Sequence, residues 1–124
     1  MQVVLGTAGK IRVRPNQLDI DLSKHRRYKL SSLEAKELSG SIVYILMDNK
    51  DVLYVGYSAR GLTRPLSLKH PYTKKCIDDS DTSSMIIYPC RDEFSARHLE
   101  RILIAKYKPK YNDTRNISSE EACV

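Results

Sequence analysis

Two apolar stretches separated by a short polar one are the clearest pattern in the chain. Residues 41–47 and 52–57 are rich in β-branched and aromatic side chains, whereas residues 48–51 have the composition of a turn. Two such stretches around a short polar loop predict an antiparallel hairpin. Because both stretches are almost entirely apolar, we expect both faces of this hairpin to be covered by the rest of the protein.

Two further strands are predicted on weaker patterns. Residues 84–88 are apolar and β-rich, and Pro89 follows them directly. Residues 10–14 alternate charged and apolar side chains up to Pro15, which is typical of a strand with one face in solvent.

Helical spacing of apolar residues predicts one long helix over residues 92–107. A shorter helix is expected to start at Ser31, where Ser31 and Glu34 have the spacing of a capping box, and to end before Gly40. Another short helix is expected over residues 62–70. A loop over residues 72–82 and a polar tail beyond Asn112 complete the prediction.

One carboxylate of the long helix falls within its apolar arc. At about 100° per residue, Glu100 lies between Tyr107 and Ile104, on the side of the helix expected to face the core. Burying an unpaired carboxylate is costly, so Glu100 needs a partner. Helix geometry alone favours a structural hydrogen bond or ion pair, and the alternative is a metal-binding or acid–base role in a cleft.

Composition restricts the class of protein. The chain has 124 residues, which is enough for one domain, and its 41% hydrophobic and 29% charged residues exclude a fibrous or wholly disordered protein. We find neither a membrane-spanning apolar run nor a secretory leader, so we expect a soluble, cytoplasmic protein without a membrane partner. The three cysteines (Cys76, Cys90 and Cys123) are widely spaced, so we expect reduced thiols rather than disulfides or a zinc site.

Positive charge is concentrated in the first part of the chain. The net charge is +6, and residues 1–76 hold 14 basic against 6 acidic side chains. This includes the basic cluster over residues 24–29. A basic field of this kind fits a polyanionic partner, and nucleic acid is the first candidate, although many small soluble proteins are equally basic.

Five residues together resemble the motifs of the GIY-YIG nuclease family. Ile42-Val43-Tyr44 and Tyr54-Val55-Gly56 carry two tyrosines ten positions apart, and Arg64 follows ten residues after Tyr54. Glu100 on the long helix and Asn112, at the end of Pro109-Lys110-Tyr111-Asn112, complete the pattern. The likeness covers residues 41–112 and is closest to the N-terminal nuclease domain of the excision-repair incision enzyme.

This resemblance implies an α+β fold with a small antiparallel three-stranded sheet flanked by helices. Residues 41–112 would form the nuclease domain, residues 1–40 an N-terminal extension with a strand and a short helix, and residues 113–124 a polar tail. The implied activity is metal-dependent endonucleolytic hydrolysis of DNA phosphodiester bonds.

The resemblance also implies a role for each motif residue. Glu100 would bind one divalent metal ion, Mg²⁺ or Mn²⁺, and Arg64 would hold the scissile phosphate. Tyr44 would be the general base, Tyr54 would hydrogen-bond to the phosphate or its water, and Asn112 would fix the geometry around them. Taken singly, each is more typical of an ordinary structural residue, so the hypothesis depends on the joint pattern.

One departure from the family bears on the chemistry. Tyr57 stands where many members have a lysine that could lower the pKa of the base. This motivates a rival hypothesis, a non-catalytic nucleic-acid-binding module of the same fold, and a ribonuclease is a third. In each case the backbone of the nucleic acid is expected to be bound by Arg60, Lys69, His70, Lys74 and Lys75.

Overall fold

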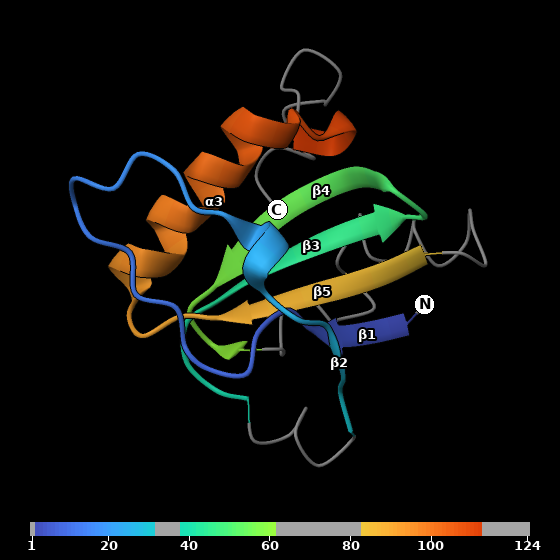
Figure 1. The fold of residues 1–124 in the computed structure, drawn as a ribbon, viewed down its shortest axis with the longest axis horizontal. Helices are drawn as coiled ribbons and strands as arrows, with labels where there is room; N and C mark the ends of the chain where they lie inside the picture. The colour runs from blue at the N-terminus through green and yellow to red at the C-terminus, as the bar shows by residue number, and fades with distance from the viewer. Residues whose placement is uncertain (1, 32–37, 62–82, 113–124) are drawn as a thin grey trace.

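The computed structural model describes residues 2–31, 38–61 and 83–112 (Figure 1). Its strands are β1 (Gln2–Leu5), β2 (Tyr28–Lys29), β3 (Ile42–Asp48), β4 (Asp51–Ser58) and β5 (Ser83–Pro89). Its helices are α3 (Glu93–Tyr107) and two 3₁₀ turns, η1 (Leu22–Lys24) and η3 (Lys110–Asn112). The expected hairpin, the strand at 84–88 and the long helix are therefore confirmed.

All five strands belong to one mixed sheet with the order β2-β1-β5-β3-β4. β3 lies antiparallel between β4 and β5, β1 runs parallel to β5, and β2 pairs antiparallel with β1. The α+β class is confirmed, and the three antiparallel strands are present. The expectation of a three-stranded sheet is not confirmed, because β1 and β2 extend it to five.

The strand expected over residues 10–14 does not form. Ile11 makes only an isolated bridge with Cys90, and the backbone N–H of Val13 donates to the Ser95 hydroxyl at 3.0 Å instead of to a neighbouring strand. Val4, Ile11 and Val13 are nevertheless buried in the same core cluster as Leu99 of α3. The described N-terminal residues thus complete the sheet and its core.

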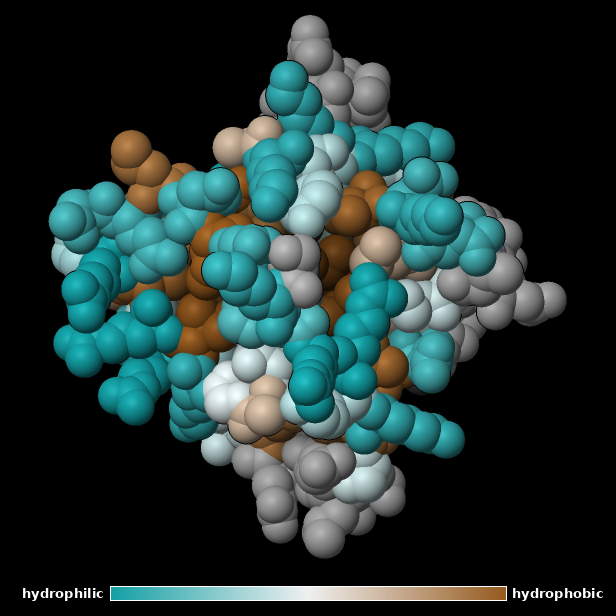
Figure 2. Space-filling view, viewed as in Figure 1, coloured by the Kyte–Doolittle hydropathy of each residue, from teal (hydrophilic) through white to brown (hydrophobic). Residues whose placement is uncertain are grey.

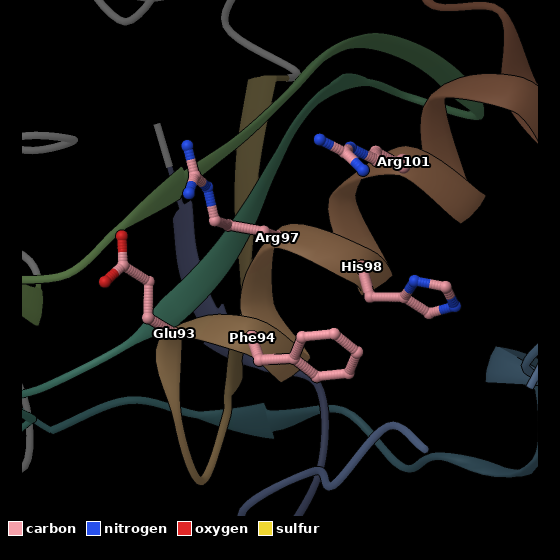
Figure 3. A pocket seen from close by; sticks show the side chains of 5 residues that line it. All are labelled: Glu93, Phe94, Arg97, His98 and Arg101. Atoms are coloured by element: carbon pink, nitrogen blue, oxygen red, sulfur yellow. The ribbon is translucent and has the colours of Figure 1, made fainter. Parts of the chain in front are cut away.

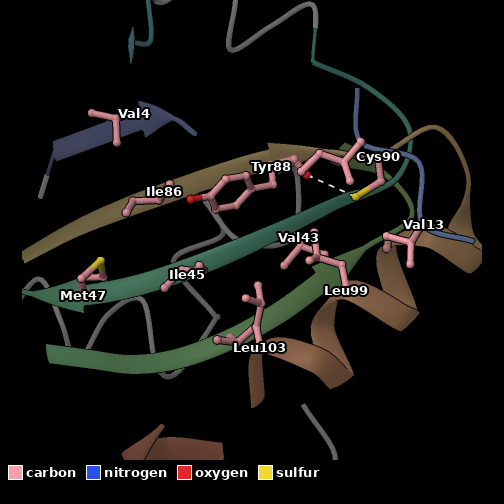
Figure 4. Close-up of a cluster of buried hydrophobic side chains, with 13 residues drawn as sticks. Val4, Val13, Val43, Ile45, Met47, Ile86, Tyr88, Cys90, Leu99 and Leu103 are labelled. Atoms are coloured by element: carbon pink, nitrogen blue, oxygen red, sulfur yellow. Dashed lines mark hydrogen bonds between the residues drawn. The ribbon is translucent and has the colours of Figure 1, made fainter. Parts of the chain in front are cut away.

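The sheet buries both of its faces, as the apolar runs predicted. On one face, Val43, Ile45 and Met47 of β3 pack with Leu99 and Leu103 of α3 (Figure 4). On the other face, a second cluster contains Ile42, Tyr44, Leu46, Met85 and Ile87. Successive strand side chains point to opposite faces, so α3 and Tyr44 lie on opposite sides of the sheet.

Helix α3 begins and ends with defined caps. The Asp92 carboxylate accepts a hydrogen bond from the Ser95 N–H at 2.6 Å, and this bond, together with one from the Ser95 side chain, lowers the pKa of Asp92. At the other end, Lys108 adopts a left-handed conformation and donates its N–H to Ile104. The chain then turns through the buried Pro109 into η3, which contacts β4.

Several expectations fall outside the described residues. They are most of the helix expected from Ser31 to Gly40, the helix over residues 62–70, the loop over 72–82 and the tail beyond Asn112. Within the described part of the chain, no helix combines the length and apolar character needed to cross a membrane.

Cys90 is a buried free thiol at the end of β5. Its sulfur donates to the carbonyl of Tyr88 at 3.5 Å (Figure 4), and burial raises its pKa to about 12. The thiolate is the reactive form of cysteine, so native Cys90 should be inert.

We therefore expect iodoacetamide at pH 8 to leave Cys90 unmodified in the native protein and to label it after denaturation in urea. Mass mapping of the peptide that contains Cys90 measures this directly. Rapid native labelling of that peptide would contradict the assigned burial.

Candidate functional site

Tyr44 and Tyr54 come together on the sheet face opposite α3. Their strands are paired with Tyr44 opposite Gly56 and Leu46 opposite Tyr54, and the two ring centroids are 6.0 Å apart at an interplanar angle of 46°. Tyr44 is buried, with 1% of its surface exposed, whereas Tyr54 is half-buried. A register shift between Leu46 and Met47 in this strand pair puts the two motif tyrosines on the same face of the sheet.

Gly56 makes room for the ring of Tyr44. A Cβ atom added at Gly56 would lie 2.6 Å from both Cζ and Oη of Tyr44 and 2.9 Å from a ring carbon of Tyr54. Such distances are impossible without moving a buried ring, so only glycine fits beneath the phenol. The glycine of Tyr54-Val55-Gly56 is therefore explained by packing: it seats Tyr44 across the strand pair.

Asn112 binds the backbone between Tyr54 and Gly56. Its Oδ1 accepts a hydrogen bond from the Val55 N–H at 2.8 Å, and its Nδ2 donates to the Val55 carbonyl at 2.9 Å. β4 is the outermost strand of the described sheet, so this side chain takes the place of a neighbouring strand at Val55. Asn112 thereby ties the turn after α3 to the segment that carries Tyr54.

Replacing Asn112 tests this clamp. We expect Asn112→Ala to lower the free energy of unfolding by about 1–3 kcal/mol, because it leaves two backbone groups without their partner. Asn112→Asp should be similarly harmful, since a carboxylate accepts from the N–H but repels the carbonyl. Urea unfolding measures both, and Asn16→Ala at an exposed position shows the background for losing an asparagine. Unchanged stability of both Asn112 variants would contradict the clamp.

Glu100 lies on the flank of α3 that faces β4. The Arg97 guanidinium lies 5.5 Å from the ring centroid of Tyr57 on β4, and Glu100 is one helical turn further on. Leu99 and Leu103 are fully buried, whereas Glu100 is half-buried at the margin of the core. Its backbone therefore lies on the opposite side of the sheet from Tyr44 and Tyr54, on a helix that contacts β4, the outermost strand of the described sheet.

The motif residues are thus only partly gathered by the described structure. Tyr44 and Tyr54 are neighbours, Asn112 is fixed to Val55 between Tyr54 and Gly56, and Glu100 flanks the same strand from its other face. Each of these three side chains, Tyr44, Tyr54 and Glu100, interacts with at least one other group, so none of them is without a partner. Arg64 lies outside the described residues, and so do Lys69, His70, Lys74 and Lys75.

Arg60 is the one predicted nucleic-acid contact that the structure describes. It is exposed just after the end of β4, and its N–H donates to the Ser58 hydroxyl at 3.2 Å. Its position beyond Gly56 and Ser58 puts a permanent cation at the end of the strand that carries Tyr54.

The outer surface of α3 carries an aromatic and basic group that the sequence patterns did not single out. Phe94 is 49% exposed and stacks on His98, with ring centroids 5.8 Å apart and an interplanar angle of 9° (Figure 3). Arg97 and Arg101 line the same shallow pocket. The i, i+4 spacing of both pairs was the signal available in the sequence.

A divalent cation would have few protein ligands here. In the described ranges, no group of three His, Cys, Asp or Glu side chains could hold a metal ion. A single carboxylate such as Glu100 fits Mg²⁺ only if water and substrate oxygens supply the remaining ligands, which is the usual arrangement for this ion.

Comparison with known proteins adds no further information about the site. No protein-family model, curated protein or solved structure matches this chain.

Proposed function

We propose that this protein is a metal-dependent endonuclease that hydrolyses DNA phosphodiester bonds at the outer edge of β4. The observation that carries the proposal is the construction around Tyr54-Val55-Gly56. Gly56 seats the ring of Tyr44, Tyr54 lies beside it, and Asn112 clamps Val55. The sequence resembles the GIY-YIG nucleases in these same residues, which supports a shared chemistry.

The metal-binding role falls to Glu100, from the α3 side of the strand. A bound Mg²⁺ or Mn²⁺ would supply charge neutralisation at the phosphate and a more acidic bound water. Because Glu100 and the phenols approach β4 from opposite faces, the scissile phosphate would cross the strand at its outer edge. Arg64 is proposed to hold that phosphate by its guanidinium.

The two phenols are proposed to activate the attacking water. Tyr44 would accept its proton, and Tyr54 would hydrogen-bond to the water or the phosphate. A free phenol has a pKa near 10, so a nearby cation must lower the pKa of Tyr44 for work near neutral pH. Arg64 and the phosphate-bound cation are the groups proposed to do so.

Cleavage of labelled DNA tests the proposal. Duplex, single-stranded and branched DNA, with matched RNA substrates alongside, are incubated with Mg²⁺ or Mn²⁺ and with EDTA. We expect internal cleavage of at least one DNA with metal and none in EDTA, and weaker binding as salt rises because the backbone charge dominates affinity. Cleavage of RNA alone would replace DNA with RNA as the substrate, and absence of any cleavage would contradict the nuclease.

A non-catalytic nucleic-acid-binding module is the second candidate, and the outer surface of α3 favours it. The stacked Phe94 and His98, with Arg97 and Arg101 beside them, combine the ring surfaces and cations that bind unpaired bases and phosphates. If the wild-type protein binds DNA without cutting it, and Arg97→Gln with Arg101→Gln weakens that binding, this candidate replaces the enzyme.

A further inference from the structure

A cavity of about 270 Å³ lies on the α3 side of the sheet, away from the two motif tyrosines. Four separate parts of the chain line it: residues 21–27 around η1, the hairpin of β3 and β4, strand β5, and the last turn of α3. In Figure 2, apolar side chains are recessed near the centre of the molecule beneath hydrophilic ones. The proposed nuclease site uses none of the residues that line this cavity.

The rim of this cavity is strongly basic. Arg27, Lys50 and Lys106 each line it, and His25 adds a fourth basic side chain against a single carboxylate, Asp21. The three permanent cations come from different segments, so the fold gathers them at one place although they are far apart in sequence. Concave basic surfaces of this kind concentrate anions.

The floor of the cavity is apolar. Ile45 and Met47 of β3 and Ile86 of β5 lie next to each other on the sheet and line it (Figure 4). The Arg27 guanidinium lies 4.0 Å from the Met47 sulfur, so a cation stands directly beside this apolar surface. A simple inorganic anion would make no favourable contact with this apolar floor, whereas a ligand with an apolar or planar part would.

Two phenols complete the lining. Tyr107 is 41% exposed at the end of α3, with the Lys106 amino group 5.7 Å from its ring centroid. Tyr88 is buried beside His25, and burial raises the pKa of Tyr88, so its hydroxyl is a neutral hydrogen-bond donor or acceptor. An exposed aromatic ring can stack on a planar base, while the ammonium group beside it can bind a phosphate.

We propose that this cavity binds a nucleotide, with the phosphate at Arg27, Lys50 and Lys106 and the base against Tyr107 and the apolar floor. Its volume is near the lower limit for ligand pockets and suits one nucleotide rather than a larger cofactor. The nucleotide can be a free nucleoside monophosphate or the terminal nucleotide of a strand, because both present a phosphate joined to a base.

Calorimetric titration at low salt, with EDTA present, tests this site without any contribution from cleavage. The ligands are the four nucleoside monophosphates, adenosine alone, inorganic phosphate, and a short oligonucleotide with and without a terminal phosphate. We expect at least one monophosphate to bind about tenfold more tightly than adenosine or phosphate. If the oligonucleotide with a terminal phosphate binds tightly instead, the strand end is the source of the nucleotide.

Variants assign the binding to the cavity. Arg27→Gln, Lys106→Gln and Tyr107→Ala, all at exposed side chains, should each weaken nucleotide binding by about tenfold while circular dichroism stays unchanged. Lys10→Gln, which also removes an exposed cation, should have no effect. The proposal is overturned if no nucleotide binds, if phosphate binds as tightly as every nucleotide, or if Lys10→Gln weakens binding as much as the cavity variants do.

Discussion

Gly56→Ala is expected to lower the free energy of unfolding by about 2 kcal/mol, an effect larger than one added methyl group normally has. The new Cβ would meet the ring of Tyr44 at 2.6 Å, and that ring is buried, so it cannot swing into solvent. Overpacking a tight core costs about 1–3 kcal/mol. Alanine's better strand propensity recovers only part of that loss.

A double-mutant cycle in urea identifies the cause. Gly56→Ala should cost much less in a Tyr44→Leu background, because the ring that it strikes is absent. Gly9→Ala is the matched control, since nothing lies within 4 Å of a Cβ at Gly9. Equal losses for Gly56→Ala with and without Tyr44 would show that Gly56 does not seat the tyrosine.

Glu100→Gln is expected to reduce DNA cleavage by at least about 100-fold while leaving the fold intact. The amide keeps the shape of the side chain but loses the charge that the proposed cation requires, and losing one such electrostatic contact typically costs that much. Binding to DNA in EDTA should change little, because the phosphate contacts come from basic side chains. Gel assays of cleavage and binding measure the two effects separately.

Glu93→Gln provides the control for the Glu100 variant. Glu93 is an exposed glutamate on the same helix, so its replacement removes the same charge at a position away from the core. Cleavage by Glu93→Gln should match wild type. If Glu100→Gln and Glu93→Gln cut equally well, Glu100 has no role in metal binding.

The elements built from strong local patterns were predictable from sequence. The apolar runs of β3 and β4 around a short polar segment predicted a hairpin. In its turn, Asn49 adopts a positive φ of 53°. The period of α3 predicted its extent to within a residue. In each case neighbours in sequence determine the structure.

Strands β1 and β2 were not predicted because they depend on distant partners. β1 is only four residues long, and it becomes a strand by pairing in parallel with β5, more than 75 residues further along the chain. Gly6 shows the same dependence, since its missing Cβ leaves room for the ring of Tyr88. No pattern in the sequence around Gly6 predicts its contact with Tyr88.

For the candidate site, sequence spacing identified residues but not their faces. Regular pairing from the turn would put Tyr44 opposite Val55 and Tyr54 on the other face, but a register shift between Leu46 and Met47 puts the two tyrosines on one face. The helical arc placed Glu100 toward the core, yet the arc alone does not say which side of the sheet α3 covers. The sequence did not predict the basic cavity either, because its cations come together only when four segments of the chain pack against each other.

Paramagnetic broadening by Mn²⁺ tests most directly whether one cation site spans the outer edge of β4. Nitrogen-15 spectra are recorded with a short DNA and a small, substoichiometric amount of Mn²⁺, for wild type and for Glu100→Gln. We expect the amide signals of Glu100, Tyr54, Gly56 and Asn112 to broaden first, and this broadening to disappear in Glu100→Gln. Broadening that is strongest elsewhere, or that survives loss of the Glu100 charge, would contradict a cutting site built around this strand.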